Sequence, residues 1–271
     1  MAYHLLQLPD PPVLGLITDF GTKDGYPGVI KGIVLSISPR AQIVDISHEI
    51  SPQAIDEAAF VLFHAYKYFP KGTLFTVVVD PGVGTDRKII GVTTENYAFL
   101  APDNGVLSAI FTFESKYKVF EIMEKRFFLP EISATFHGRD IFAPVSGQFL
   151  NGLTFSEMGE EAQTYHSGQV PKAAVSDDKI SGKIIYVDRF GNLISNIFMK
   201  DVLEFASKKS VFIRVGKYQI KGLSQTFQTE GGTSLQAYPD SSGFLGFSIF
   251  RKNAAAETGL QKGDLAEVFG V

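Results

Sequence analysis

The sequence contains no cysteine and no tryptophan among its 271 residues. The lack of cysteine excludes disulfides, thiolate nucleophiles and cysteine-ligated zinc. The lack of tryptophan leaves 24 phenylalanines and 10 tyrosines to supply any aromatic stacking surface. No apolar run approaches the roughly 18 residues that a membrane span needs. The N-terminus also lacks a charged segment followed by an apolar core. We therefore expect a cytoplasmic protein with no membrane partner.

An excess of positive charge is also missing. Lys and Arg number 25 against 29 Asp and Glu, which gives a net charge of −4. Proteins that bind nucleic-acid phosphates concentrate basic residues, and no basic run occurs here. Neither a GxGxxG fingerprint nor a GxxxxGK[ST] loop is present, so NAD and nucleoside triphosphates lack their usual cradle. Nucleic acid and these nucleotides are therefore not expected as partners.

The first part of the chain alternates strand-like and helix-like segments. An apolar run at residues 13–18 precedes a helical spacing at 26–37, and Pro52 is expected to open a second helix. Further strands are predicted at 42–46, 73–79, 89–93 and 97–100, with another helix at 106–111. This alternation predicts an α/β domain over residues 1–168, with a mostly parallel sheet flanked by helices.

The pattern changes after residue 168. Residues 169–179 are expected to form a linker. Residues 180–271 contain closely spaced short strand-like pieces, several of them separated by glycine turns. Such a pattern predicts a smaller C-terminal β-barrel domain.

The most informative stretch is an apolar strand, Val77–Val79, that ends in Asp80 and is followed by a Pro-Gly-Val-Gly turn leading to Arg87. A second segment presents His137 beside Gly138, where the absence of a side chain allows close approach to the backbone. Taken singly, the aspartate satisfies turn amides, the arginine is a surface cation and the histidine is a loop residue. Taken together, the carboxylate, guanidinium and imidazole are suited to hold and polarise a water molecule.

Two further groups are candidates for ligand binding. Asp19 ends an apolar strand before a glycine-rich turn, so it either caps that turn or binds a ribose diol. The segment Asp188–Asn192 combines an anion, the aromatic Phe190 and an amide, so it is either a polar β-turn or a purine-recognition element. Phe227 could form the second wall of an aromatic stack there, although a single Phe more often belongs to a core.

Together these residues resemble the S-adenosylmethionine hydroxide adenosyltransferase family, the relatives of the fluorinases and chlorinases. The matching motifs are Thr18-Asp19-Phe20-Gly21, Val44-Asp45-Ile46-Ser47-His48, Val79-Asp80-Pro81-Gly82-Val83-Gly84, Ala101-Pro102-Asp103-Asn104-Gly105, Phe136-His137-Gly138-Arg139-Asp140 and Asp188-Arg189-Phe190-Gly191-Asn192. They occur in order along nearly the whole chain.

The resemblance implies a reaction, a site and an assembly. The reaction is hydrolysis of S-adenosylmethionine to adenosine and L-methionine, without metal or cofactor, by a catalytic set of Asp80, Arg87 and His137. The assembly is a homotrimer whose sites lie between subunits. The implied substrate-binding residues are Asp19 for the ribose, Asp24 and Asp188 for the methionine ammonium, Ser241 for its carboxylate, Phe190, Phe227, Asn192 and the backbone near Ala254 for adenine, together with Val83 and Gly138.

The sequence departs from the family pattern at some positions, and two other functions are also considered. Halogenating relatives have an aromatic or hydroxylated residue in place of Asp80, whose fixed carboxylate would repel a halide. Asp240 stands before Ser241 where relatives usually carry Asn, which adds a negative charge beside the expected carboxylate site. The alternatives are a metal-dependent hydrolase with Asp19, Asp80 and His137 as ligands, and a non-catalytic sensor of adenosine or S-adenosylmethionine.

Overall fold

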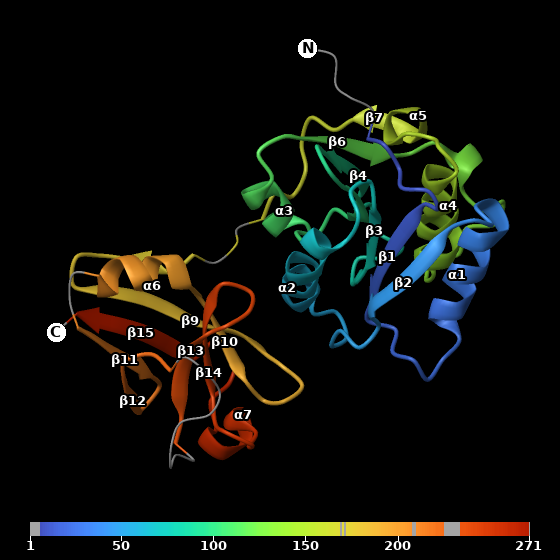
Figure 1. The fold of residues 1–271 in the computed structure, drawn as a ribbon. Helices are drawn as coiled ribbons and strands as arrows, with labels where there is room; N and C mark the ends of the chain where they lie inside the picture. The colour runs from blue at the N-terminus through green and yellow to red at the C-terminus, as the bar shows by residue number, and fades with distance from the viewer. Residues whose placement is uncertain (1–5, 169, 171, 208–209, 225–233, 271) are drawn as a thin grey trace. The chain divides into compact units, whose positions relative to one another are not determined.

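The computed structural model describes residues 6–168, 170, 172–207, 210–224 and 234–270. Contacts divide the chain into two units, residues 1–170 and 171–271 (Figure 1). Each unit is described separately below. No helix in the described part of the chain is both long and apolar enough to cross a bilayer.

The N-terminal unit is built on a 7-stranded sheet with the order β2-β1-β3-β5-β4-β6-β7. The first four strands in this order run parallel to one another, whereas β4, β6 and β7 each pair antiparallel with a neighbour. The expected mostly parallel sheet is confirmed, and its antiparallel part includes the expected hairpin of β4 and β5. The strands are β1 (Val13–Thr18), β2 (Gln42–Ser47), β3 (Leu74–Val78), β4 (Ile89–Thr94), β5 (Ala98–Pro102), β6 (Tyr117–Ile122) and β7 (Gly159–Glu161).

Helices cover both faces of this sheet (Figure 1). On one face α1 (Tyr26–Ile37) packs against α4 (Ala143–Leu150), and on the other α2 (Ile55–Ala65) packs against α3 (Ser108–Phe113). Every residue of β1 and β3 is buried, as expected for strands covered on both faces. The remaining short elements of this unit are η1 (Tyr66–Tyr68), η2 (Lys125–Phe127), the π-helix η3 (Gly138–Phe142) and α5 (Phe155–Met158).

The register of β1 and β3 positions the candidate residues. Thr18, the last residue of β1, pairs with Val78, the last residue of β3. The loops that follow the two strands carry Asp19 and Asp80. Because β1 and β3 are adjacent and parallel, both carboxylates leave the sheet at the same edge.

The start of α2 differs from the prediction. The sequence predicts a helix from Pro52, and this prediction is wrong, because the helix begins at Ile55. Gln53 adopts a left-handed backbone conformation with φ of 65°. A residue in this conformation cannot belong to a right-handed helix, so the helix starts beyond it.

The C-terminal unit is an antiparallel, barrel-like sheet of 8 strands, as expected from its short strand-like segments. The path runs β12-β11-β15-β9-β10-β14-β13, and β8, which lies within the expected linker 169–179, pairs with β9. Its elements are β8 (Ala174–Val175), β9 (Lys179–Val187), β10 (Leu193–Phe198), α6 (Met199–Ala206), β11 (Val211–Val215), β12 (Tyr218–Lys221), β13 (Gln236–Pro239), β14 (Phe244–Ser248), α7 (Ala254–Thr258) and β15 (Leu265–Gly270).

Candidate active site

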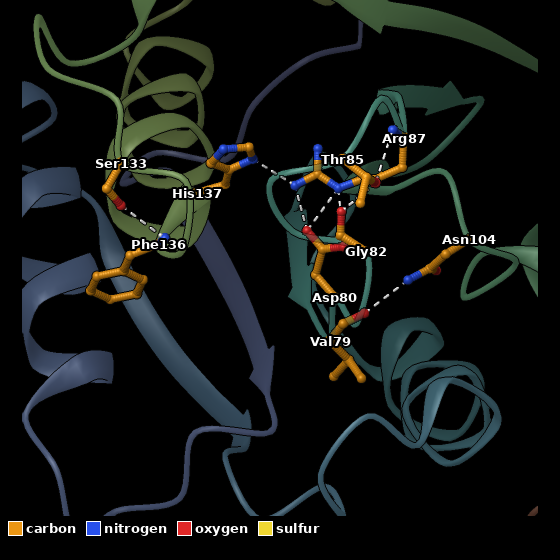
Figure 2. Close-up of polar contacts among 9 residues, drawn as sticks. All are labelled: Val79, Asp80, Gly82, Thr85, Arg87, Asn104, Ser133, Phe136 and His137. Carbon is orange, nitrogen blue, oxygen red and sulfur yellow. Dashed lines mark hydrogen bonds and ion pairs between the residues drawn. The ribbon is translucent and has the colours of Figure 1, made fainter.

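Asp80 and Arg87 form a buried ion pair at the end of β3 (Figure 2). Arg87 Nε donates to both carboxylate oxygens of Asp80, at 3.0 Å to Oδ1 and 2.8 Å to Oδ2, and Nη2 also donates to Oδ2. The side chains are only 5% and 11% exposed, so the pair is not a surface contact. Thr85 closes the intervening loop, because its hydroxyl donates to the Gly82 carbonyl at 2.7 Å. The loop therefore brings the Arg87 guanidinium back to the end of β3.

His137 completes the cluster from a different part of the chain. It lies immediately before η3, and its Nδ1 atom is 2.8 Å from Nη2 of Arg87 (Figure 2). A guanidinium has donors only, so Nδ1 must accept this hydrogen bond. The neutral imidazole consequently carries its proton on Nε2.

The surroundings of His137 favour that neutral form. Burial and, to a lesser extent, the Arg87 cation lower the pKa of His137 below its ordinary value of 6.5. The charges of Asp80 and Asp140 and a hydrogen bond with the Ser133 backbone act in the opposite direction. The net result is an imidazole that accepts from Arg87 at neutral pH.

Asp19 lies at the end of β1, next to the strand that carries Asp80. Its Oδ2 accepts a hydrogen bond of 2.8 Å from the Gln53 backbone N–H. The adjacent backbone is tied to His48, whose Nδ1 is 2.8 Å from the Thr18 hydroxyl and whose carbonyl accepts from Gly21 N at 2.7 Å. The Asp19 carboxylate is thus oriented by one bond through Oδ2, and Oδ1 has no partner among the described contacts.

Three aromatic rings lie between the Asp19 loop and the His137 segment. Phe20, Tyr26 and Phe136 make edge-to-face contacts with one another. The ring centroids are 5.9 Å apart for Phe20 and Tyr26, 5.8 Å for Phe20 and Phe136, and 5.1 Å for Tyr26 and Phe136. They come from the loop after β1, the start of α1 and the residue before His137. The packing of these rings holds the loop after β1 against the segment that carries His137.

Other candidates from this unit have less to do with the cluster. Asp24 is exposed just before α1, and Val83 is partly buried within the loop between Asp80 and Arg87. Gly138 is buried, and a Cβ placed on it would meet Phe136 at 3.2 Å and Val78 at 3.3 Å. The missing side chain of Gly138 therefore faces packed apolar groups.

In the C-terminal unit, Asp188, Phe190 and Asn192 form one turn. The Asp188 Oδ1 atom accepts from the backbone N–H groups of Phe190 and Asn192 at 2.9 and 2.8 Å. Asp188 Oδ2 accepts from Asn192 Nδ2 at 2.8 Å. The Phe190 ring is 77% exposed at the tip of this turn. The segment fits both the polar β-turn and the purine-recognition interpretation, because it is a well-ordered turn that presents an exposed aromatic ring.

The start of α7 lies against this turn. The Ala255 N–H donates to the Gly191 carbonyl at 3.0 Å, which brings Ala254 beside the same segment. Burial first, and then the charges of Asp240 and Asp188, raise the pKa of Tyr238, which precedes the Ser241 turn. Asp240 Oδ1 accepts from Ser242 N at 2.9 Å and from the Ser242 hydroxyl, and Ser241 itself is exposed. Phe227 lies outside the described residues.

Several residues support the cluster without having been singled out. Asn104 Nδ2 donates to the Val79 carbonyl at 2.9 Å and fixes the backbone just before Asp80 (Figure 2). Ser133 Oγ accepts from Phe136 N at 3.0 Å and closes the turn before His137. Asn104 lies within a family motif, whereas no local signal marks Ser133.

A separate pocket of about 920 Å³ occurs elsewhere in the N-terminal unit. Its lining includes Leu8, Phe120, Phe149 and Phe155 and none of the predicted site residues. The candidate site is therefore defined by its polar geometry and not by this cavity.

Comparison with known proteins agrees with these features. Residues 14–159 match the family model described as the SAM hydroxide adenosyltransferase N-terminal domain, and residues 182–267 match the model of the C-terminal domain. An (R)-S-adenosyl-L-methionine hydrolase from Methanocaldococcus jannaschii is 34% identical over 257 residues, covering 90% of each chain. A fluorinase from Actinoplanes sp. is 25% identical over 218 residues, covering 70% of this chain and 73% of that protein. The crystal structure of an uncharacterized conserved protein from Thermotoga maritima superposes with a TM-score of 0.88 at 35% identity, covering 94% of this chain and 99% of that one.

The fold and site define a class of protein in which an α/β unit bearing a carboxylate–guanidinium–imidazole cluster is joined to a barrel-like β unit. Both family models match in order and together span most of the chain. The chain belongs to the SAM hydroxide adenosyltransferase family, which confirms the resemblance seen in the sequence motifs.

Proposed function

We propose that this protein hydrolyses S-adenosylmethionine to adenosine and L-methionine. The observation that carries the proposal is the hydrogen-bonded cluster of Asp80, Arg87 and His137 at the carboxyl end of β3. Relatives at 34% and 30% identity over most of the chain carry the name (R)-S-adenosyl-L-methionine hydrolase, which supports it.

The chemical problem is to supply a nucleophile. The water oxygen forms a bond to the ribose 5′ carbon while the bond from that carbon to sulfur breaks. The electron pair goes to sulfur, which converts the sulfonium into the thioether of methionine. Because the leaving group is already cationic, it needs no acid. A water molecule held in line with the C–S bond, with a base beside it, is therefore the main requirement.

Asp80 is the better candidate for the base. Nδ1 of His137 already accepts from Arg87, so the neutral imidazole has no lone pair directed at a water. Arg87 donates once to Oδ1 and twice to Oδ2 of Asp80, so Oδ1 keeps a lone pair for a water. In this proposal Asp80 accepts the water proton, Arg87 stabilises the oxygen as negative charge develops, and His137 holds the guanidinium in place.

Substrate contacts are proposed for the remaining residues. Oδ1 of Asp19 would accept from the ribose hydroxyls, while Oδ2 stays bonded to Gln53. The exposed ring of Phe190 would stack on adenine, and Asn192 and the Ala254 backbone would contact its edge. Asp24, Asp188, Ser241, Val83 and Gly138 complete the proposed binding set, together with Phe227.

A metal-dependent hydrolase fits this geometry less well. The Arg87 guanidinium lies between Asp80 and His137 and bonds to both, so the two side chains present no shared vacancy for a cation. Within the described part of the chain, no group of three or more His, Asp and Glu side chains is arranged to hold a metal ion.

A homotrimer with sites between subunits, a cytoplasmic location and independence from cofactors are also part of the proposal. Light scattering coupled to size-exclusion chromatography tests the assembly, for which we expect three times the chain mass. A monomer with full activity would contradict the intersubunit site.

The function is tested by incubating the purified protein with each sulfonium epimer of S-adenosylmethionine, in the presence of a chelator and ¹⁸O-labelled water. We expect equal amounts of adenosine and methionine, with the label in the adenosine 5′ hydroxyl. Loss of activity with the chelator would favour the metal-dependent alternative. Tight binding of adenosine without product from either epimer would favour the sensor.

A further inference from the structure

Asp140 is a fully buried carboxylate that follows His137 by three residues. Its side chain has 0% exposure. Oδ2 accepts from the Ser133 backbone N–H at 2.8 Å, and Arg139 Nε donates to Oδ1 at 2.6 Å. The Asp140 carbonyl accepts from Leu129 N at 2.9 Å. Burying an ionised carboxylate is unfavourable unless it is paired and hydrogen-bonded, so this residue must hold the segment before it in one arrangement.

Ser133 connects Asp140 with the turn that precedes His137. Its N–H donates to the Asp140 carboxylate at 2.8 Å. Because Nδ1 of His137 accepts from Arg87, the ring N–H is on Nε2. The Ser133 hydroxyl accepts from Phe136 N, which keeps the intervening turn closed. Asp140 therefore anchors the turn 133–136 that leads into His137, and Nδ1 of His137 in turn accepts from Arg87.

The opposite side of this segment is held by Gly84. Gly84 has φ of 80°, and a Cβ placed on it would lie 2.3 Å from the Ala134 carbonyl oxygen. The loop between Asp80 and Arg87 thus touches the segment 133–137 backbone to backbone. Any side chain at Gly84 must push the two loops apart, in addition to straining the left-handed backbone.

We propose that Asp140 is a positioning residue for His137, and that it acts with Gly84 to clamp segment 133–137 against the loop carrying Asp80 and Arg87. The clamp fixes the imidazole with Nδ1 facing Arg87. The inference rests on the proposed function only in taking Asp80, Arg87 and His137 as the reacting cluster.

The main test is the titration of His137, followed by NMR of the imidazole resonances and assigned with His137→Gln. Asp140→Asn keeps an oxygen for Ser133 N but removes the charge that opposes the effects of burial and of Arg87 on His137. Asp80, which also faces the ring, is unchanged. We expect His137 to titrate at lower pH than in the wild type. We also expect kcat to fall about tenfold with KM little changed, since small misplacements of a reacting group cost up to ~10²-fold.

Gly84→Ala provides a second variant, with Gly152→Ala as its matched control. Gly152 also has a positive φ, 102°, but a Cβ on it has nothing within 4 Å. Both variants carry backbone strain, and only Gly84→Ala forces the loops apart. We expect Gly84→Ala alone to shift the His137 titration and to lower kcat.

An unchanged His137 titration and unchanged kcat in folded Asp140→Asn would overturn the proposal. If Asp140→Asn does not fold, Gly84→Ala decides. An unchanged His137 titration and kcat in Gly84→Ala would overturn the proposal, whereas a titration shift in Gly84→Ala that Gly152→Ala does not show would support it. The titration does not depend on turnover. A wild-type protein without hydrolase activity would therefore refute the proposed function while leaving the clamp to be judged by NMR.

Discussion

Nη2 of Arg87 lies 2.8 Å from Nδ1 of His137, and the same nitrogen donates to the Asp80 carboxylate. One guanidinium therefore bonds to both an anion and a neutral ring. This relationship assigns the imidazole proton to Nε2, and in the mechanism that we propose it leaves Asp80 to accept a proton from water.

Replacement of Asp80 tests this assignment. Asp80→Asn keeps the shape of the side chain but removes its basicity, so we expect kcat to fall by ~10²–10⁴-fold, the usual contribution of a general base. Adenosine affinity, measured by calorimetry, should change little. Asp86→Asn is the matched control, because Asp86 is an exposed carboxylate in the same loop. Full activity in Asp80→Asn or in Asp80→Ala would remove Asp80 from the mechanism.

The pH dependence of activity should report His137. Protonation places a proton on Nδ1 facing the Arg87 donor, so we expect kcat to decline as pH falls through the lowered pKa of His137, below 6.5. His137→Gln offers Arg87 a neutral acceptor that does not titrate, and it should retain more activity at acid pH than His137→Leu. A wild-type acid limb that persists unchanged in His137→Gln would belong to another group.

The free energy of unfolding should follow the same titration. The folded pKa of His137 lies below its unfolded value near 6.5, so the unfolded chain binds more protons in the interval between them. The stabilisation from keeping His137 neutral is therefore complete above the unfolded pKa and is lost as pH falls through the folded pKa. Urea unfolding at several pH values, compared with His137→Gln, measures this slope. Equal slopes in the two proteins would contradict it.

The local sequence pattern correctly predicted the helices and strands whose bounds depend only on packing in the core. The bounds of β1 and α1 agree with the predicted ranges 13–18 and 26–37, because β1 is a continuous apolar run that is buried throughout and the helical spacing of α1 places Ile30 and Val34 in the core. The prediction for α2 failed at Gln53, where the backbone serves Asp19 and adopts a conformation that no helical pattern reveals. Motif spacing indicated Asp80, Arg87 and His137 as a set. It could not indicate Ser133, whose contacts use a backbone N–H that any residue supplies and a hydroxyl that lies outside the motifs.

Gln53 gives a prediction about this strained backbone. Its N–H orients Asp19 while its φ is 65°, a conformation that glycine adopts freely and a β-branched residue resists. Gln53→Gly should melt at or above the wild-type temperature and keep adenosine affinity. Gln53→Val should lose about 1–3 kcal/mol of stability and raise KM with kcat little changed. Equal KM values for the two variants would show that the Gln53 backbone does not control Asp19.

Phe190 gives a prediction about adenine stacking. Its ring is 77% exposed, so Phe190→Ala should leave the melting temperature unchanged while weakening adenosine binding by ~1–3 kcal/mol, the usual range for base stacking. Tyr68→Ala is the control, because the Tyr68 ring is 82% exposed and lies in the N-terminal unit away from the predicted binding set. A loss of stability without a loss of affinity in Phe190→Ala would assign the ring to packing. Equal affinity losses in the Phe190 and Tyr68 variants would show an effect of surface aromatics in general, and stacking at this turn would then be wrong.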